Sequence, residues 1–214
     1  MRPVGTEPEH VSIGGDAVFG DAAPGFRACE STQTYRVERL SAADAGACLD
    51  GLVALLRDVV DGGASVGFLP PLDPAAAAEY WVAAIRAVAA GTRVLLAAVE
   101  DGAVLGSVQA DLAPMPNARH RAEVMKLMVH SVARRRGIGG ALMRAIEDAA
   151  RAMGRTLLVL DTRRGDAAER LYERLGYVRA GVIPRYARGA AGSLDDTVLF
   201  YRELWDGVAN VRQE

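Results

Sequence analysis

The chain has 214 residues, of which half are hydrophobic and about a quarter are charged. That length suits one domain, or two small ones, with a well-formed core. The net charge is −2, so no whole-molecule field favours nucleic acid or an anionic membrane. The longest apolar runs are far shorter than a membrane span, and the N-terminus lacks a secretory signal pattern. We therefore expect a cytoplasmic protein that binds neither nucleic acid nor membrane.

The N-terminal segment differs in composition from the rest of the chain. Residues 1–33 are rich in Gly, Pro, Ala and acidic residues and show no apolar periodicity. This composition predicts a disordered extension followed by a single domain over residues 34–207. The two cysteines, Cys29 and Cys48, suit neither a metal site nor a disulfide framework. We expect free thiols and no bound metal.

The N-terminal half of the domain begins with a short strand over residues 34–40. Ser41 can cap the helix that follows, and Asp44 strengthens its start. Apolar residues keep helical spacing as far as Val60. The next segment, residues 61–72, combines glycines with exposed-looking apolar residues. It is either a loop folded onto the core or a wall of a substrate pocket.

The remaining elements alternate between strands and helices. Asp101-Gly102 is a hairpin signal between two apolar strands. The predicted helices cover residues 74–90, 137–153 and 166–175, and the predicted strands cover residues 93–100, 103–112, 123–129, 156–161, 177–183 and 197–204. The order is βααβββαβαββ.

This order predicts an α/β fold, classed as α+β in some schemes. The segment from Glu123 to Asp161 is a βαβ crossover, so its two strands are parallel. The hairpin before it is antiparallel. We expect a mixed, mostly antiparallel sheet of about seven strands with helices on both faces.

A basic, glycine-rich turn opens the helix that begins near Gly137. Residues 134–140 read Arg-Arg-Arg-Gly-Ile-Gly-Gly. Unpaired N–H groups at a helix start carry partial positive charge, glycines allow close approach, and arginines bind phosphate oxygens. The pattern favours a pyrophosphate seat over a solvated basic turn with glycines for packing. It is not a P-loop, because no Gly-Lys-Ser/Thr follows.

Two spaced motifs resemble those of the GNAT (GCN5-related) N-acetyltransferases. Arg134-x-x-Gly137-x-Gly139 at a helix start is similar to their acetyl-CoA motif, and the segment from Ala168 to Tyr177 is similar to their second signature. The resemblance implies a GNAT fold that uses acetyl-CoA as co-substrate. It implies cofactor contacts from Leu127, Met128, Val129, Arg134, Arg135, Arg136, Gly137, Ile138, Gly139 and Gly140.

The resemblance also implies direct attack of an amine on the thioester, without an acyl-enzyme. Tyr172 matches the family tyrosine that protonates the departing thiolate, although a tyrosine here can also simply pack the helix onto the sheet. Glu123 matches the carboxylate proposed as general base, and Asp161 is an alternative base or an anchor for the substrate ammonium. At about 3.3 Å per residue, these carboxylates share a site only if the register is offset or the strands splay.

A narrower resemblance concerns the acceptor. Three segments look like the tabtoxin-resistance acetyltransferases, which acetylate an amino group of a β-lactam dipeptide toxin. They are Gly-Gly-Ala-Ser-Val-Gly-Phe at residues 62–68, Ala-Glu-Val-Met-Lys-Leu-Met-Val-His at residues 122–130 and Leu-Asp-Thr at residues 160–162. Gly63, Phe68 and Trp81 are candidate pocket walls. Gly165 stands where the broader family often has an Asn that contacts the pantetheine.

The sequence does not identify the acceptor. A small amine is the first hypothesis, giving antibiotic or toxin resistance as one role. The alternatives are a protein N-terminal or lysine acetyltransferase, or a CoA-binding module without catalysis. Either a monomer or a homodimer is compatible with the sequence.

Overall fold

The computed structural model describes residues 34–205 of the chain. The predicted extension over residues 1–33, including Cys29, lies outside the described residues. Cys48 has a free thiol. Seven strands form one sheet in the order β1-β2-β3-β4-β5-β7-β6. The strands are β1 (Arg36–Arg39), β2 (Arg93–Glu100), β3 (Ala103–Leu112), β4 (Arg121–Val129), β5 (Leu157–Arg163), β6 (Val178–Arg188) and β7 (Leu194–Glu203).

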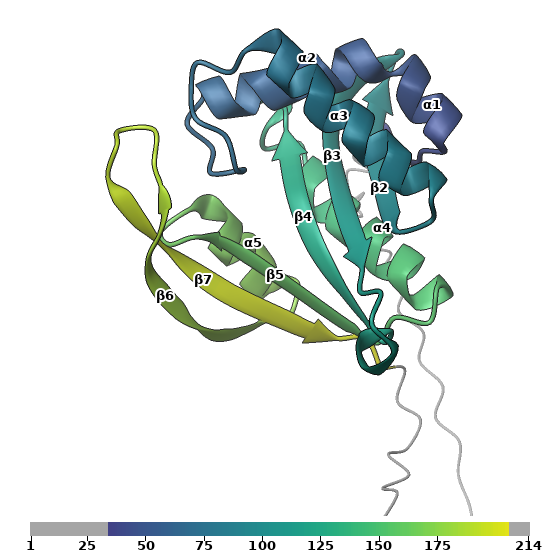
Figure 1. Cartoon of the computed structure of the whole chain (residues 1–214), viewed down its shortest axis with the longest axis vertical. Coiled ribbons are helices and arrows are strands. Elements are labelled where there is room, and N and C mark those ends of the chain that lie inside the picture. Colours follow the sequence, from purple (N-terminus) through teal and green to yellow (C-terminus); the bar gives the residue numbers. More distant parts are fainter. Residues whose placement is uncertain (1–33, 206–214) are drawn as a thin grey trace, which may run out of the picture. The chain divides into compact units, whose positions relative to one another are not determined.

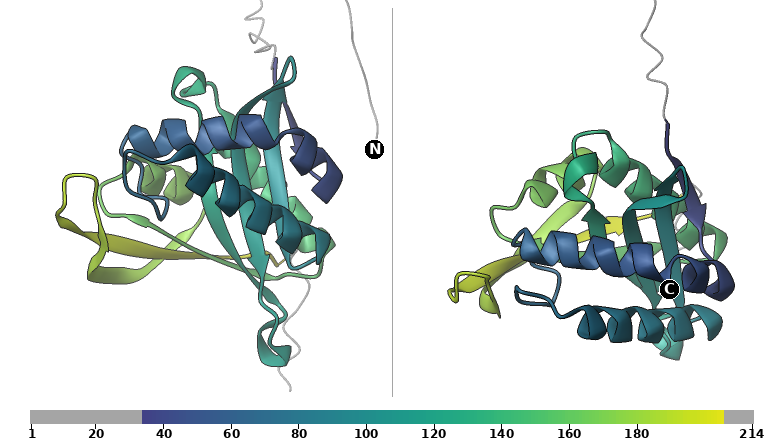
Figure 2. Two further views of the ribbon diagram at one scale, coloured as in Figure 1. Left: turned by 45° about the horizontal axis from the view of Figure 1, so that its top comes forward. Right: turned by 90° about the horizontal axis from the view of Figure 1, so that it is seen from above.

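Five α-helices cover the two faces of this sheet (Figures 1 and 2). They are α1 (Ala42–Ala47), α2 (Leu49–Asp61), α3 (Pro74–Ala89), α4 (Ile138–Ala152) and α5 (Ala167–Arg174). One core cluster contains the apolar side chains of α4, and a second contains those of α2 and α3. The predicted fold class, a mixed and mostly antiparallel sheet between helices, is confirmed.

The helix predicted after Ser41 is divided at Cys48 into α1 and α2. Cys48 has φ −96° and ψ 9°, and its N–H bonds back to the carbonyls of Asp44 and Gly46. The break lets both short segments contact the core, because Ala45 and the apolar side of α2 are both buried. Three helices therefore precede β2, where the sequence predicted two.

The predicted hairpin and crossover are both present. Asp101 and Gly102 have φ of 48° and 82°, as a two-residue type I′ turn requires, and β2 pairs with β3 in antiparallel fashion. β4 and β5 are parallel neighbours joined through α4. The predicted order of elements after α3 is thus confirmed.

Strand β4 and helix α4 both lie so close to Gly106 of β3 that this position has no room for a side chain. A Cβ on Gly106 would lie 2.7 Å from the Met128 carbonyl oxygen and 3.1 Å from Ile138 Cγ2. We expect Gly106→Ala to lower the free energy of unfolding by about 2 kcal/mol, because backbone and core must shift to admit the methyl group. Urea denaturation measures this.

Gly181 provides the matched control for that substitution. It is also a strand glycine, but a Cβ there would meet nothing within 4 Å. Gly181→Ala should leave the free energy of unfolding within about 0.5 kcal/mol of the wild-type value. Equal effects of the two substitutions would show that close packing at Gly106 is not the cause.

Candidate functional site

The parallel strands β4 and β5 are hydrogen-bonded neighbours over a short stretch only. Arg121–Glu123 pair with Leu157–Val159, and no pairing follows. Figure 1 shows the two strands meeting at one end and diverging toward the other. From Val124 onward β4 is paired on its β3 side alone. We call this region, between residues 124–129 of β4 and the end of β5, the β4–β5 opening; its unpaired strand edge can bind an extended ligand through the backbone.

The predicted cofactor turn lies between β4 and α4. Gly137 caps α4 with φ 80°, a left-handed conformation that glycine adopts without strain. The consecutive backbone N–H groups of residues 136–140 find no acceptor among the described residues. Free N–H groups at a helix start form a ready anion site. The turn thus has the donors that a pyrophosphate needs.

One predicted phosphate ligand is engaged elsewhere. The Arg136 guanidinium donates to both carboxylate oxygens of Glu100, at 3.0 and 2.6 Å, and to Thr34 Oγ1 at 2.8 Å. These bonds tie the turn to the end of β2. Arg134 and Arg135 are exposed and form no ion pair within residues 34–205. Arg134 donates only to the Val129 carbonyl oxygen, at 3.5 Å, so these two guanidinium groups are less engaged than that of Arg136.

A carboxylate from α2 holds the start of the turn. Asp58 accepts hydrogen bonds from Ser131 N at 2.8 Å and Ser131 Oγ at 2.7 Å. Partial burial raises the pKa of Asp58, but the bonds from Ser131 and the nearby His130 and Arg134 outweigh it, so the pKa is lowered. The charged carboxylate therefore fixes the loop that follows β4.

Tyr172 lies on α5 with its ring packed against Tyr177 and Phe200. Its side chain is buried. Burial raises the pKa of the phenol well above its usual value, and the negative charges of Asp161 and Asp166 raise it further. The hydroxyl therefore remains protonated across the physiological range. Both alternatives from the sequence, packing and proton donation, are compatible with this position.

The two candidate carboxylates lie at different positions along the paired strands β4 and β5. Glu123 is opposite Val159 in the paired part of β4 and β5. Asp161 lies two residues further along β5, about 7 Å at the usual rise per residue, where pairing with β4 has ended. Asp161 accepts a hydrogen bond from Thr197 Oγ1 at 2.7 Å. The register is offset and the strands splay, so Asp161 rather than Glu123 borders the opening.

The predicted pocket walls have mixed outcomes. Phe68 is half-buried and packs edge-to-face with Tyr80, with ring centroids 5.5 Å apart. Trp81 is completely buried in the core between α3 and the sheet, so it supports Tyr80 from behind and does not line a pocket. Sequence reasoning missed Lys126, whose ammonium lies 5.4 Å from the Tyr80 ring centroid. Lys126 is the one lysine of the chain, and this was the sequence feature that could have drawn attention to it.

The loop that carries Gly63 is tied to the far side of the opening. Arg163, at the end of β5, donates to the Gly63 carbonyl at 3.2 Å. The same guanidinium donates to Asp166 at 2.8 Å and lies 3.8 Å from Asp195. The predicted substrate loop is thus fixed to β5, to the start of α5 and to the β6–β7 hairpin.

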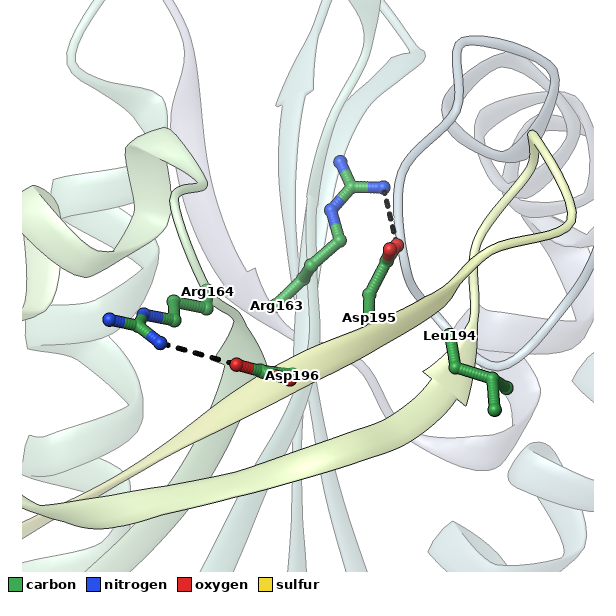
Figure 3. Close-up of a pocket in the computed structure, with 5 residues that line it drawn as sticks. All are labelled: Arg163, Arg164, Leu194, Asp195 and Asp196. Atoms are coloured by element: carbon green, nitrogen blue, oxygen red, sulfur yellow. Dashed lines mark hydrogen bonds and ion pairs between the residues drawn. The ribbon is translucent and has the colours of Figure 1, made fainter.

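A recess next to this anchor is lined by Arg163, Arg164, Leu194, Asp195 and Asp196. In Figure 3, Arg163 points toward Asp195 and Arg164 toward Asp196. Its arginines are already paired with its carboxylates, so we do not assign the acceptor to this recess. Among residues 34–205, no group of His, Cys, Asp and Glu side chains could hold a metal ion. The described helices are all too short or too polar to cross a membrane.

The splayed strands, the free N–H groups before α4 and the tyrosine on α5 agree with a comparison to known families. Residues 52–177 match the acetyltransferase (GNAT) family. The chain belongs to this family. It is accordingly an acyltransferase whose donor is acetyl-CoA. That donor fits the turn found here, because the unpaired N–H groups of residues 136–140 suit its pyrophosphate.

Solved structures of acetyltransferases share this fold. A putative acetyltransferase, yncA, from Salmonella typhimurium with its cofactor acetyl-CoA is similar at 20% identity and a TM-score of 0.64, covering 84% of this chain and 99% of that one. A GCN5-related N-acetyltransferase from Kribbella flavida is similar at 24% identity and a TM-score of 0.67, covering 81% and 99%. An N-acetyltransferase from Staphylococcus aureus Mu50 is similar at 18% identity and a TM-score of 0.67, covering 80% and 99%.

Proposed function

We propose that this GNAT enzyme acetylates the primary amine of a small, amino-acid-like molecule. The observation that carries the proposal is the anchored loop: Arg163 holds the Gly63 carbonyl across the β4–β5 opening. A loop fixed in this way restricts access on the acceptor side, which suits a small molecule better than a protein chain. The likeness of residues 62–68 to the tabtoxin-resistance acetyltransferases makes a β-lactam amino-acid toxin the first acceptor to try.

The chemistry assigned to the opening has three parts. Asp161 accepts a proton from the acceptor ammonium, directly or through water, and the free amine attacks the thioester carbonyl. The unpaired edge of β4 offers the backbone N–H groups of Leu127 and Val129 to the oxyanion and the pantetheine, whereas strand alternation turns the Met128 N–H toward Ser107 of β3. The nitrogen loses its second proton to water, and the tetrahedral intermediate expels the CoA thiolate, which takes a proton from Tyr172. Water returns a proton to Tyr172 and Asp161 releases its proton to solvent, so each turnover yields the amide, the free thiol and one proton.

A thiol-release assay tests this proposal. The purified chain is mixed with acetyl-CoA and a panel of β-lactam amino-acid toxins, free amino acids, aminoglycosides, polyamines and peptide N-termini. We expect turnover confined to a small-amine class. Turnover on peptides alone would support a protein acetyltransferase instead, and acetyl-CoA binding by calorimetry without any turnover would indicate a non-catalytic module.

The same assay distinguishes the two carboxylates. Asp161→Asn keeps an oxygen for the Thr197 hydroxyl but cannot accept the proton, so we expect kcat to fall about 100-fold. Glu123→Gln serves as the matched control and should change kcat by less than about 10-fold. If Glu123→Gln lowers kcat more than Asp161→Asn does, Glu123 is the general base. Calorimetry with acetyl-CoA should give the wild-type Kd for both variants.

A further inference from the structure

The β4–β5 opening contains a lysine that neither the fold nor the proposed chemistry explains. Lys126 interrupts the ladder between β3 and β4 with φ 52°, and the register shifts beside it. The irregularity directs its side chain to the face covered by α3 and the substrate loop. The ammonium lies 5.9 Å from the Phe68 ring centroid and 5.4 Å from that of Tyr80. A Cβ on Gly67 would lie only 3.2 Å from Nζ.

This ammonium lacks an anionic partner in the part of the chain that the structure describes. Residues 34–205 offer Lys126 no hydrogen bond and no ion pair, only the two aromatic rings. The charge of Asp111 acts on Lys126, but Asp111 is already bound by Arg93, whose Nη2 donates to Asp111 Oδ2 at 2.7 Å. A half-buried charge without a counter-ion is costly, because burial removes its hydration. Burial accordingly lowers the pKa of Lys126.

The residue type is informative as well. The chain has 25 lysines and arginines, and Lys126 is the one lysine among them. A compact ammonium has room between Phe68, Tyr80 and Gly67, whereas a planar guanidinium needs more space. In this arginine-rich chain, the position therefore specifically requires a compact cation. Lys126 lies on the same strand as the backbone assigned to the thioester. This location indicates a role in holding the acceptor.

We propose that Lys126 binds a carboxylate of the acceptor, so that the enzyme selects amines that also carry a carboxylate. The inference rests on the proposed function. Asp161 lies across the opening on β5, close enough for its charge to act on Lys126. An amino acid complements this pair, since its ammonium can bind Asp161 while its carboxylate binds Lys126. Phe68 and Tyr80 exclude water around the second contact and so strengthen it.

Matched substrate pairs test the inference. The probes are free L-amino acids and β-lactam amino acids, each beside its own carboxamide, assayed for thiol release. We expect KM for the wild type to be about 10- to 100-fold lower for the free acid, as a hydrogen bond between charged groups allows. In Lys126→Met this preference should disappear, through a higher KM for the acid and an unchanged KM for the amide. The kcat should stay within about 3-fold. Lys126→Arg should recover at most part of the preference, because a guanidinium keeps the charge but needs more space than the ammonium.

A second readout is independent of turnover. Because Lys126 is the one lysine of the chain, biosynthetic labelling with 13Cε-lysine gives a single side-chain signal. In the CoA-bound protein, free acids of the panel should shift this signal and their carboxamides should not. Lys126→Met should fold with a melting temperature at least equal to that of the wild type, because a thioether fits the aromatic site without a desolvation cost.

The possible results separate the two proposals. A wild-type enzyme that acetylates acid and amide equally well overturns the carboxylate inference and leaves the proposed function intact. A preference that persists unchanged in Lys126→Met overturns the inference as well. Failure to acetylate either member of any pair overturns the proposed function itself.

Discussion

Tyr172→Phe is expected to lower kcat by about 100- to 1,000-fold, the range that a positioned general acid contributes. The substitution removes only the hydroxyl, so the ring contacts with Tyr177 and Phe200 remain. The raised pKa of Tyr172, caused first by burial and then by Asp161 and Asp166, keeps the proton on the phenol above pH 10. We therefore expect no loss of wild-type kcat from ionisation of this phenol near its ordinary pKa.

Tyr177→Phe is the matched control for this experiment. Tyr177 is also buried, and burial raises its phenol pKa as well. Its ring lies under the Arg202 guanidinium, and Glu147 acts on its pKa, so its hydroxyl belongs to the core between α4 and β7. Tyr177→Phe should leave kcat within about 3-fold of wild type. If both variants keep full kcat while binding acetyl-CoA normally, Tyr172 has only a packing role.

Local sequence signals predicted the elements that are stabilised by local interactions. The helix predicted over residues 137–153 is α4, whose apolar residues at 3.6-residue spacing form its buried face. The Asp101-Gly102 turn and the capping box at Ser41 likewise depend on residues next to them in the chain. These features need no knowledge of distant neighbours.

What the sequence did not indicate comes from interactions between distant segments. Arg136 reads as a phosphate ligand, and the bond from its guanidinium to Glu100, 36 residues earlier, has no sequence signal. Trp81 reads as a pocket wall because aromatic residues often line pockets, yet packing of α3 on the sheet buries it completely. Strand β6 runs to Arg188, further than predicted. The sequence did not indicate this length because almost every residue of this edge strand is exposed, so alternating hydrophobicity is absent.

The candidate site could be proposed from the sequence as a set of residues but not as an arrangement. The motifs identified Tyr172 and the turn before α4, whereas the relative depth of Glu123 and Asp161 depends on the register of β4 against β5. The position of Lys126 depends on an irregularity in β4 that has no sequence signal, since lysine does not favour φ of 52°. Backbone exceptions of this kind cluster at functional sites, and here one brings a cation to the opening.

Gly137→Ala is expected to raise the Kd for acetyl-CoA about 10- to 100-fold. Alanine at φ 80° is strained by about 1 kcal/mol, and the turn relieves that strain by rotating the peptides around it. Those peptides carry the free N–H groups of residues 136–140, so rotation turns donors away from the pyrophosphate. Losing one or two hydrogen bonds to a charged group accounts for the expected change in Kd. Isothermal calorimetry measures it.

Gly154→Ala separates loss of donors from loss of stability. Gly154 follows the other end of α4 with φ 69°, and a Cβ there would meet nothing within 4 Å. Both substitutions impose similar backbone strain on the same helix, so urea denaturation should show similar losses of about 1 kcal/mol. Only Gly137→Ala should change the Kd, because only the N-terminal end of α4 presents unpaired donors to a phosphate. Equal Kd values for the two variants would mean that the pyrophosphate does not bind at this turn, and the contacts assigned to Arg134 and Arg135 would be wrong with it.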